Sequence, residues 1–262
     1  MIRLLSRSSW YADWVTPNVK QGKIHIGTSG WHYRHWIGTF YPLGTKTNKQ
    51  FGLYQKSFDT VEINNSFYRL PAPEVFKSWR KESPDNFLFV VKASRYITHN
   101  KKLKDPEESI KRFFTNVRFL RDKLGPILFQ LPPSWKKNAE RLHAFLAILP
   151  KKYRYVFEFR NSTWYDEEII SLLKKHNCAF CIYELAGHAS PAHVTADFVY
   201  VRLHGPGNAK YQGSYTEDQL QEWAEQCRNW QREGLDVFVF FDNDEQGYAA
   251  FNALSLKKLL AK

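Results

Sequence analysis

Cysteine is scarce in this sequence, with only Cys178, Cys181 and Cys227 among 262 residues. Three cysteines in a chain of this length form no disulfide framework, which is typical of a reducing compartment, so we expect a cytoplasmic protein. Cys178 and Cys181 form a C-x-x-C inside a short apolar run that is typical of a β-strand. Residues three apart on a strand point to opposite faces, which predicts buried thiols and excludes a shared metal or redox pair.

Long hydrophobic runs are also missing. No stretch approaches the roughly 20 apolar residues that a transmembrane helix needs, so we expect no membrane partner. The first 23 residues contain Arg3, Arg7 and Asp13 and no continuous apolar segment, which argues against a secretory signal. We interpret residues 1–23 as an N-terminal extension and residues 24–262 as one domain.

Several catalytic motifs are absent: H-E-x-x-H, C₂H₂ zinc spacing, the P-loop and G-x-S-x-G. Their absence removes motif support for those chemistries, and we expect no cofactor. Acidic residues are outnumbered, with 26 Asp and Glu against 38 Lys and Arg, for a formal net charge of +12. Such a surface attracts anions, although the lysine pairs are dispersed along the chain and form no basic tail.

Eight short apolar runs, rich in Val, Ile and Phe, alternate with helical patterns. They span residues 24–29, 60–64, 87–93, 127–131, 155–159, 179–183, 198–203 and 237–241. Continuously apolar strands are typical of a parallel sheet covered by helices on both sides or closed on itself. Eight such units in a chain of this length predict an α/β fold, a (β/α)₈ TIM-like barrel with a closed parallel sheet and outer helices.

The segments between these runs carry helix signals. Asp105-Pro106 resembles an N-cap followed by proline at the first helical position. Thr216 and Gln219 form a capping box before an apolar stripe that ends at Gly234. Two connections are irregular: the sixth, which is short and loop-like, and the seventh, which begins with a glycine-rich loop.

Polar residues recur two positions apart at the ends of nearly all predicted strands. Because positions i and i+2 share a strand face, we expect these side chains to point into the top of the barrel, where barrel enzymes place their active sites. The residues are Thr28, Glu62, Asn64, Lys92, Gln130, Glu158, Arg160, Arg202, His204 and Asp242. They predict a polar, net-cationic pocket at the C-terminal ends of the strands.

Within this pocket we assign candidate roles by residue type. Arg160, Arg202 and Lys92 are suited to bind a phosphate or carboxylate. Candidate catalytic groups for acid–base chemistry are four side chains: Glu62, Glu158, His204 and Asp242. Gly27-Thr28-Ser29-Gly30 is a weak candidate for an anion-binding loop.

Two other interpretations of the same residues remain open. The charged groups can neutralise one another as a buried network. The three carboxylates and His204 can also ligate a divalent metal. We favour no metal, because Arg160 shares a strand face with Glu158 and Arg202 shares one with His204, and cations among the ligands oppose a divalent ion.

Many separate motifs also resemble, in order, the family called domain of unknown function 72, or YecE-like. The likeness runs from about residue 24 to residue 262 and is carried by 26–31 (IGTSGW), 58–64 (FDTVEIN), 67–71 (FYRLP), 128–133 (LFQLPP), Glu158-Phe159-Arg160 with Trp164, 198–205 (FVYVRLHG), Tyr211 with 213–215 (GSY), Asn243-Asp244 and 252–254 (NAL). The resemblance implies a (β/α)₈ barrel and supplies no reaction. Asp242 departs from the family, which has Asn there, and the Tyr183-Glu184 region departs from its acidic-Ser-Pro pattern, which leaves any role of strand six open.

We add four residues to the candidate substrate-binding set, namely Tyr211 and Asn243 from the family motifs and the rim aromatics Trp31 and Tyr68. Three functions remain open. The first is an enzyme, a hydrolase or isomerase, that acts on a small molecule bearing phosphate or carboxylate. The second is a nucleic-acid-binding protein or nuclease, in which rim aromatics stack on bases. The third is a non-catalytic ligand-binding scaffold. The sequence predicts no oligomeric state.

Overall fold

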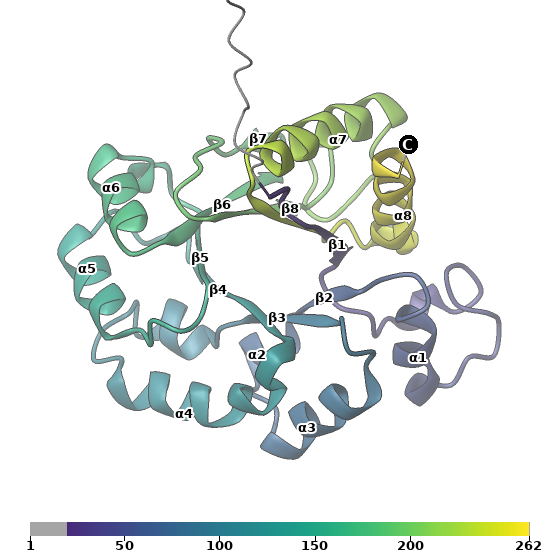
Figure 1. Cartoon of the computed structure of the whole chain (residues 1–262), viewed down its shortest axis with the longest axis horizontal. Helices are drawn as coiled ribbons and strands as arrows, with labels where there is room; N and C mark the ends of the chain where they lie inside the picture. Colours follow the sequence, from purple (N-terminus) through teal and green to yellow (C-terminus); the bar gives the residue numbers. More distant parts are fainter. Residues whose placement is uncertain (1–19, 262) are drawn as a thin grey trace, which may run out of the picture.

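The computed structural model describes residues 20–261, which form a nearly closed parallel barrel. Its eight strands surround a common axis (Figure 1). They are β1 (Ile24–Thr28), β2 (Thr60–Ile63), β3 (Leu88–Lys92), β4 (Leu124–Leu131), β5 (Tyr155–Phe159), β6 (Cys178–Leu185), β8 (Phe198–Leu203) and β9 (Asp236–Phe241). Around the ring they follow the order β1-β9-β8-β6-β5-β4-β3-β2, and every pairing between them is parallel. The predicted barrel is therefore confirmed.

Helices cover the outside of the ring (Figure 1). They are α1 (Gln50–Tyr54), α2 (Asn65–Tyr68), α3 (Pro73–Glu82), α4 (Glu107–Val117), α5 (Ala139–Ile148), α6 (Glu167–Lys175), α7 (Glu217–Arg232) and α8 (Tyr248–Leu260). The sixth connection is the exception within the described chain. It holds β7 (His188–Ala189), a short strand antiparallel to β6, where the other connections have a helix. The loop-like gap in the sequence thus corresponds to a turn.

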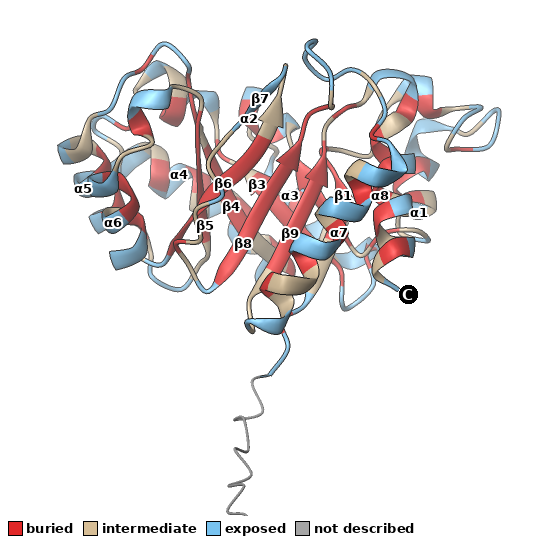
Figure 2. Ribbon diagram, turned by 90° about the horizontal axis from the view of Figure 1, so that it is seen from above, coloured by how far each residue is buried: buried red, intermediate tan, exposed pale blue. Residues whose placement is uncertain are grey.

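Side chains of the barrel pack in two shells, because alternate strand residues face opposite sides. The outer shell lies between strands and helices and contains most of the buried aromatics. The inner shell fills the barrel and includes Val90, Leu128, Val156, Phe198, Tyr200, Phe238 and Phe240. Figure 2 shows the strands buried along most of their length, with their carboxyl ends gathered at one rim. Cys178 belongs to the outer shell and Cys181 to the inner one, so the two thiols face opposite sides as predicted.

The ring closes between β1 and β2 by two contacts. At the carboxyl end, Ser29 and Glu62 form an isolated parallel bridge. Below it, the Tyr54 hydroxyl from α1 donates to the Thr60 carbonyl and accepts from Thr28 N–H, each at 3.0 Å. Gly27 leaves room for this close approach, because a Cβ at that position would lie 2.4 Å from the Thr60 carbonyl oxygen.

The opposite end of the barrel receives the chain from the predicted extension. Residues 1–19 of that extension lie outside the described residues. Gly22 N–H already donates to the Gln231 carbonyl at 3.1 Å, and Lys23 N–H donates to Asp236 at 2.9 Å. Between residues 20 and 261, no helix combines the length and the apolar character needed to cross a membrane.

Candidate functional site

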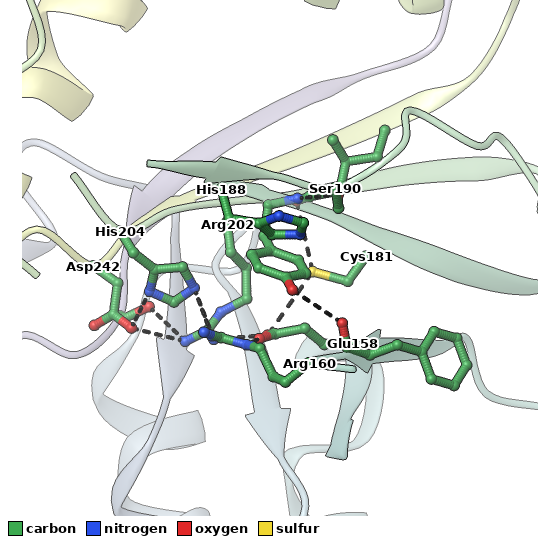
Figure 3. A network of polar contacts seen from close by, with 12 residues as sticks. Glu158, Arg160, Cys181, His188, Ser190, Arg202, His204 and Asp242 are labelled. Atoms are coloured by element: carbon green, nitrogen blue, oxygen red, sulfur yellow. Dashed lines mark hydrogen bonds and ion pairs between the residues drawn. The ribbon is translucent and has the colours of Figure 1, made fainter. Parts of the chain in front are cut away.

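Arg202, on the inward face of β8, lies at the centre of a charged cluster at the carboxyl ends of the strands (Figure 3). Its side chain is 1% exposed. Nε and Nη2 donate to the two oxygens of Glu62 at 3.0 and 2.6 Å, Nη1 donates to Glu158 Oε2 at 2.8 Å, and Nη2 reaches Asp242 Oδ2 at 3.0 Å. One guanidinium therefore joins carboxylates from β2, β5 and the end of β9.

Both oxygens of the Glu62 carboxylate accept several hydrogen bonds. Besides the bidentate contact with Arg202, its carboxylate accepts from Ser29 Oγ at 2.7 Å and from the Tyr200 hydroxyl at 2.5 Å. Ser29 also lies 3.3 Å from Arg202 Nη2. Because Glu62 and Arg202 are fully buried and fully hydrogen-bonded, they form a floor that seals the packed interior of the barrel.

Above this floor, Glu158, Arg160 and His204 form a chain of contacts. Arg160 Nε donates to Glu158, and Arg160 Nη2 lies 2.9 Å from His204 Nε2. His204 Nδ1 lies 3.0 Å from Asp242 Oδ2, close enough for an ion pair but outside hydrogen-bond alignment. Since Nε2 faces guanidinium donors, we assign the proton of the neutral ring to Nδ1. Asp242 thereby orients His204, and Glu158 and His204 together orient Arg160.

The pKa values follow from this arrangement. Burial alone would raise the pKa of the Glu158 carboxyl, but Arg160 and Arg202 outweigh it and hold that pKa far below its usual range. The pKa of Asp242 is lowered too, because contacts with His204 and Arg202 exceed the effect of burial. Burial and the nearby Arg202 lower the pKa of His204 to about 4. At neutral pH these carboxyls are ionised and His204 is uncharged.

The cluster is therefore electrically balanced. The three cations Lys92, Arg160 and Arg202 stand against the three carboxylates of Glu62, Glu158 and Asp242. This corrects the expectation of a net-cationic pocket, because the buried His204 is uncharged and adds nothing to the three cations that the three carboxylates offset. Within the described chain, no group of three or more His, Cys, Asp or Glu side chains is arranged to hold a metal ion.

The last inward residue of several strands forms a half-buried mouth over the floor, made by Asn64, Lys92, Gln130, Arg160 and Asp242. Here several polar atoms, most of them donors, lack partners among residues 20–261. Lys92 Nζ forms no ion pair or hydrogen bond, and Arg160 Nη1 has no hydrogen-bond partner. The Gln130 side chain makes none either, and the buried Asn64 Oδ1 is unpartnered. The mouth therefore offers hydrogen bonds that the protein itself does not use.

Lys92 has a distinct environment at the end of β3. Its Nζ lies 4.5 Å from the centroid of the Phe67 ring, and the His99 ring meets the same Phe67 edge-on at 4.9 Å. Burial, followed by the charge of Arg202, lowers the pKa of Lys92 to about 8, although the cluster carboxylates oppose the shift. Burial, Lys92 and Arg95 lower the pKa of His99 to about 4, so this second imidazole is neutral at pH 7.

Aromatic side chains border the mouth beside Arg160 and His204. The Arg160 guanidinium lies over the Tyr183 ring at 4.6 Å, and Tyr183 donates its hydroxyl to the Phe159 carbonyl at 3.1 Å. Tyr211, 44% exposed in the loop after β8, places its ring 5.4 Å from that of His204. Strand six, whose role the sequence left open, thus supplies a wall of the site.

Four candidate residues lie away from the cluster. The Thr28 hydroxyl contacts Tyr54 on the outer side of β1, and Ser29 holds the inward position expected of Thr28. Asn243 donates to the Gly213 carbonyl at 2.8 Å and supports the loop that carries Tyr211. The other two are aromatic: Trp31 packs against Phe51 and Trp79 in the outer shell, and Tyr68 is 74% exposed on α2.

Tyr68 borders a groove of about 1490 Å³ between the α2–α3 segment and the start of α4. Tyr96, also exposed, stands on the same groove. The charged side chains that line it are of both signs: Arg69, Lys101, Arg112, Asp105, Glu107 and Glu108. This groove flanks the barrel and does not include the charged cluster.

Sequence reasoning missed five residues of the site: Ser29, Tyr183, Tyr200, Cys181 and His99. Tyr200 had a usable signal, because it shares strand parity with Arg202. Ser29 was missed because the inward position of β1 was assigned to Thr28. Cys181 Sγ lies 4.0 Å from Glu158 on the inner face. His99 had no such signal, since it stands on the turn Tyr96–Asn100 after β3.

Comparison with known proteins agrees with this architecture. The family model described as Protein of unknown function DUF72 matches residues 25–262. The chain is 28% identical to the UPF0759 protein YunF of Bacillus subtilis, over 90% of this chain and 94% of that protein. It is 29% identical to the UPF0759 protein YecE of Escherichia coli over 54% of this chain and 50% of that protein. A DUF72 family crystal structure from Thermotoga maritima superposes with a TM-score of 0.83 at 30% identity, covering 92% of this chain and all of that one.

Proposed function

The chain belongs to the DUF72 family, whose description names no reaction, and from that premise we propose that it is a barrel enzyme for a small molecule bearing a carboxylate or phosphate. The substrate binds at the mouth formed by Asn64, Lys92, Gln130, Arg160 and Asp242. The observation that carries this proposal is the set of unused donors above a floor whose own hydrogen bonds are complete.

The balance of donors and acceptors selects the ligand. Asp242 and Glu158 already accept from the guanidinium groups of Arg202 and Arg160, and His204 Nδ1 lies 3.0 Å from Asp242. The polar atoms left for a ligand are mainly the N–H groups of Arg160, Lys92 and Gln130. A ligand must therefore bring acceptor oxygens, and carboxylate or phosphate oxygens suit a guanidinium held in a fixed orientation.

Catalytic roles follow from protonation states. Glu62 and Glu158 both bond to Arg202, so we assign them to positioning and not to proton transfer. His204 is neutral, but both guanidinium groups cover its Nε2. Lys92, with a pKa of about 8, is the mouth residue best matched to proton transfer near neutral pH.

Ligand binding tests this proposal directly. Phosphorylated sugars and small carboxylates are screened by thermal shift and calorimetry, because a ligand at about 100 times its Kd stabilises the fold by about 2.7 kcal/mol. Arg160→Gln and Lys92→Met are expected to weaken binding at least tenfold, whereas Arg154→Gln, on a partly exposed pair at the other end of the barrel, leaves it unchanged. Equal affinity in all three variants rejects the mouth as the site.

Nucleic-acid binding is a second candidate, supported by the exposed rings of Tyr68 and Tyr96. The groove beside them weakens it, since three carboxylates offset its three cations. Affinity for a single-stranded oligonucleotide that falls steeply with salt supports this alternative. Binding of a small anion without any turnover supports the third candidate, a ligand-binding scaffold.

A further inference from the structure

We infer that Lys92 is the nucleophile of this site and forms an imine with the carbonyl carbon of a small oxo acid. The substrate class is a ketone or aldehyde that also carries a carboxylate or phosphate. This inference rests on the proposed function, because Arg160 must hold the anionic group while the carbonyl reaches Lys92 Nζ.

The first support is the missing partner of Lys92. Lys123 is more deeply buried, but its Nζ donates to the Arg80 carbonyl, the Ser83 carbonyl and the Ser83 hydroxyl at 3.0, 2.7 and 3.1 Å. Lys257 Nζ donates to the Ser57 carbonyl at 2.7 Å. Among residues 20–261, Lys92 Nζ has no hydrogen bond and rests on the Phe67 ring. An amine without a partner keeps its lone pair available once it loses its proton.

The second support is the mixed environment of the amine. Burial and the nearby Arg202 guanidinium disfavour the ammonium form, which is how proteins activate a lysine as a nucleophile. With a pKa of about 8, roughly one tenth of the Lys92 side chains are free amine at pH 7. The neutral His99 imidazole meets the same Phe67 ring edge-on, and we assign to it the proton that the attacking amine releases.

The chemistry balances without any further reactant. The Nζ lone pair forms the C–N bond while the carbonyl π electrons move to oxygen, which gives a carbinolamine after proton transfer. The proton that the attacking nitrogen gives to His99 ends on the alkoxide oxygen of the carbinolamine. Protonation of the resulting hydroxyl uses a second proton, the one that the Lys92 ammonium released to solvent on becoming a free amine, and loss of one water then gives the iminium ion. The iminium replaces the ammonium as a cation, so the charge balance with Glu62, Glu158 and Asp242 is kept.

Reductive trapping tests the inference. The full chain is incubated with pyruvate, glyoxylate or dihydroxyacetone phosphate and cyanoborohydride, and the adduct is located by peptide mass spectrometry. We expect one adduct per chain, on Lys92, formed at least tenfold more slowly in Arg160→Gln. Lys92→Arg, which keeps the charge, is expected to melt like the parent protein and to form no specific adduct. L-Lactate, which lacks the carbonyl, is expected to slow trapping without being trapped.

The outcomes separate the two proposals. Calorimetric binding of these anions without an adduct on Lys92 overturns the nucleophile and leaves the proposed binding site standing. An adduct on Lys92 whose rate is unchanged in Arg160→Gln supports the nucleophile and contradicts the anion-binding role. Label spread evenly over exposed lysines such as Lys111, or equal labelling of Lys92→Arg, overturns the inference.

Discussion

Arg202 is the residue on which the charged cluster depends. A buried arginine joined to three carboxylates is stable only as a complete set, because each isolated charge in the interior carries a large desolvation cost. The geometry uses its N–H groups within the protein, which differs from the anion-binding role that its residue type indicated. Arg202 therefore affects a substrate indirectly, because it fixes the positions of Glu158 and Asp242.

We predict that Arg202→Met lowers the free energy of unfolding by about 3–5 kcal/mol, because it leaves Glu62, Glu158 and Asp242 buried without their common cation. Urea denaturation measures the change. Arg154→Met is the matched control: its pair with Asp236 is partly exposed, so about 0–1 kcal/mol is expected. A loss in Arg202→Met no larger than in the control contradicts the floor assignment.

Strand parity explains which site residues the sequence could predict. Residues two apart share a face, and Glu62, Lys92, Glu158, Arg160, Arg202, His204 and Asp242 all reach the same rim. On β1, the sequence analysis predicts that Thr28 faces the inside of the barrel, whereas Ser29, the next residue, does so. The neutral state of His204 and the completion of Arg202's hydrogen bonds could not be predicted, because both depend on burial and on distances between strands far apart in the sequence.

At the scale of elements, the Tyr54 hydroxyl links β1 and β2, the two neighbouring strands that no continuous ladder of backbone hydrogen bonds joins. Tyr54 reaches from α1 between β1 and β2 and pairs with one backbone group of each. Without it, Thr28 N–H and the Thr60 carbonyl are left buried and unpaired, which costs about 1–3 kcal/mol.

Tyr54→Phe is therefore expected to destabilise the barrel by about 1–3 kcal/mol in chemical denaturation. It is also expected to increase amide exchange in β1 and β2 more than in β5. Tyr248→Phe removes a hydroxyl that bonds only an exposed glutamine side chain, and a change below about 0.5 kcal/mol is expected there. Uniform exchange in the Tyr54→Phe variant contradicts the closing role.

The loop that carries Tyr211 is anchored by Asn252 of α8. Asn252 Oδ1 accepts from Tyr215 N–H at 3.1 Å and from Asn243 at 2.8 Å, and its amide donates to the Ser214 hydroxyl at 3.1 Å. Gly205 turns the loop with φ of 109°, and a Cβ there would lie 2.1 Å from the Gln212 carbonyl oxygen.

We predict that Asn252→Leu frees this loop from α8. Hydrogen exchange is expected to rise in residues 206–215 and to stay unchanged in β2 to β5, since the lost bonds are confined to that corner of the rim. Limited proteolysis gives an independent readout, with faster cleavage in the same segment. Protection of 206–215 equal to that of the parent protein shows that Asn252 does not hold the loop.

Element boundaries show what local patterns miss. The capping box at Thr216 and Gln219 is present, with Thr216 N–H donating to Gln219 at 3.0 Å. The predicted helix start at Asp105-Pro106 is wrong, because Asp105 has φ of 42° and α4 begins at Glu107 after an uncapped Pro106. The turns 96–100 and 102–105 fix the chain direction there, and their geometry depends on packing that a cap signal does not contain.

At the scale of the whole molecule, the buried neutral His204 makes the free energy of unfolding depend on pH. The folded pKa of His204 is about 4 against 6.5 unfolded, so the unfolded chain binds more protons between these values. The contribution of the neutral His204 to the stability of the fold is therefore complete above pH 6.5 and is lost as the pH falls towards 4. Asp244, whose pKa burial raises to about 7, acts in the opposite direction.

The contribution of His204 is isolated by comparing how steeply the free energy of unfolding depends on pH in the parent protein and in a variant without this histidine. Between pH 4.5 and 6, the free energy of unfolding of His204→Asn is expected to depend on pH less steeply than that of the parent protein, by up to about 1.4 kcal/mol per pH unit. Asp244 is present in both proteins and cancels. Urea titrations at several pH values measure the slopes, and parallel lines show that His204 is protonated in the folded state.

The barrel itself could be predicted from sequence because every strand is buried on both faces and therefore continuously apolar. The order of strands around the ring then follows from right-handed parallel connections. The turn at β7 (His188–Ala189) replaces one helix, as the short gap indicated. Closure between β1 and β2 had no sequence signal, since it uses a tyrosine from a helix.

The sealed floor has an evolutionary consequence. The side chains of Lys92 and Gln130 and the Asn64 Oδ1 make no hydrogen bond to Glu62, Glu158 or Arg202, so the stability of the barrel depends little on which side chains stand at these three positions. Positions such as Lys92, Gln130 and Asn64 are thus free to vary at little cost in folding. A descendant of this protein can acquire a new substrate by changing a few rim residues, while the buried ionic layer passes on unaltered.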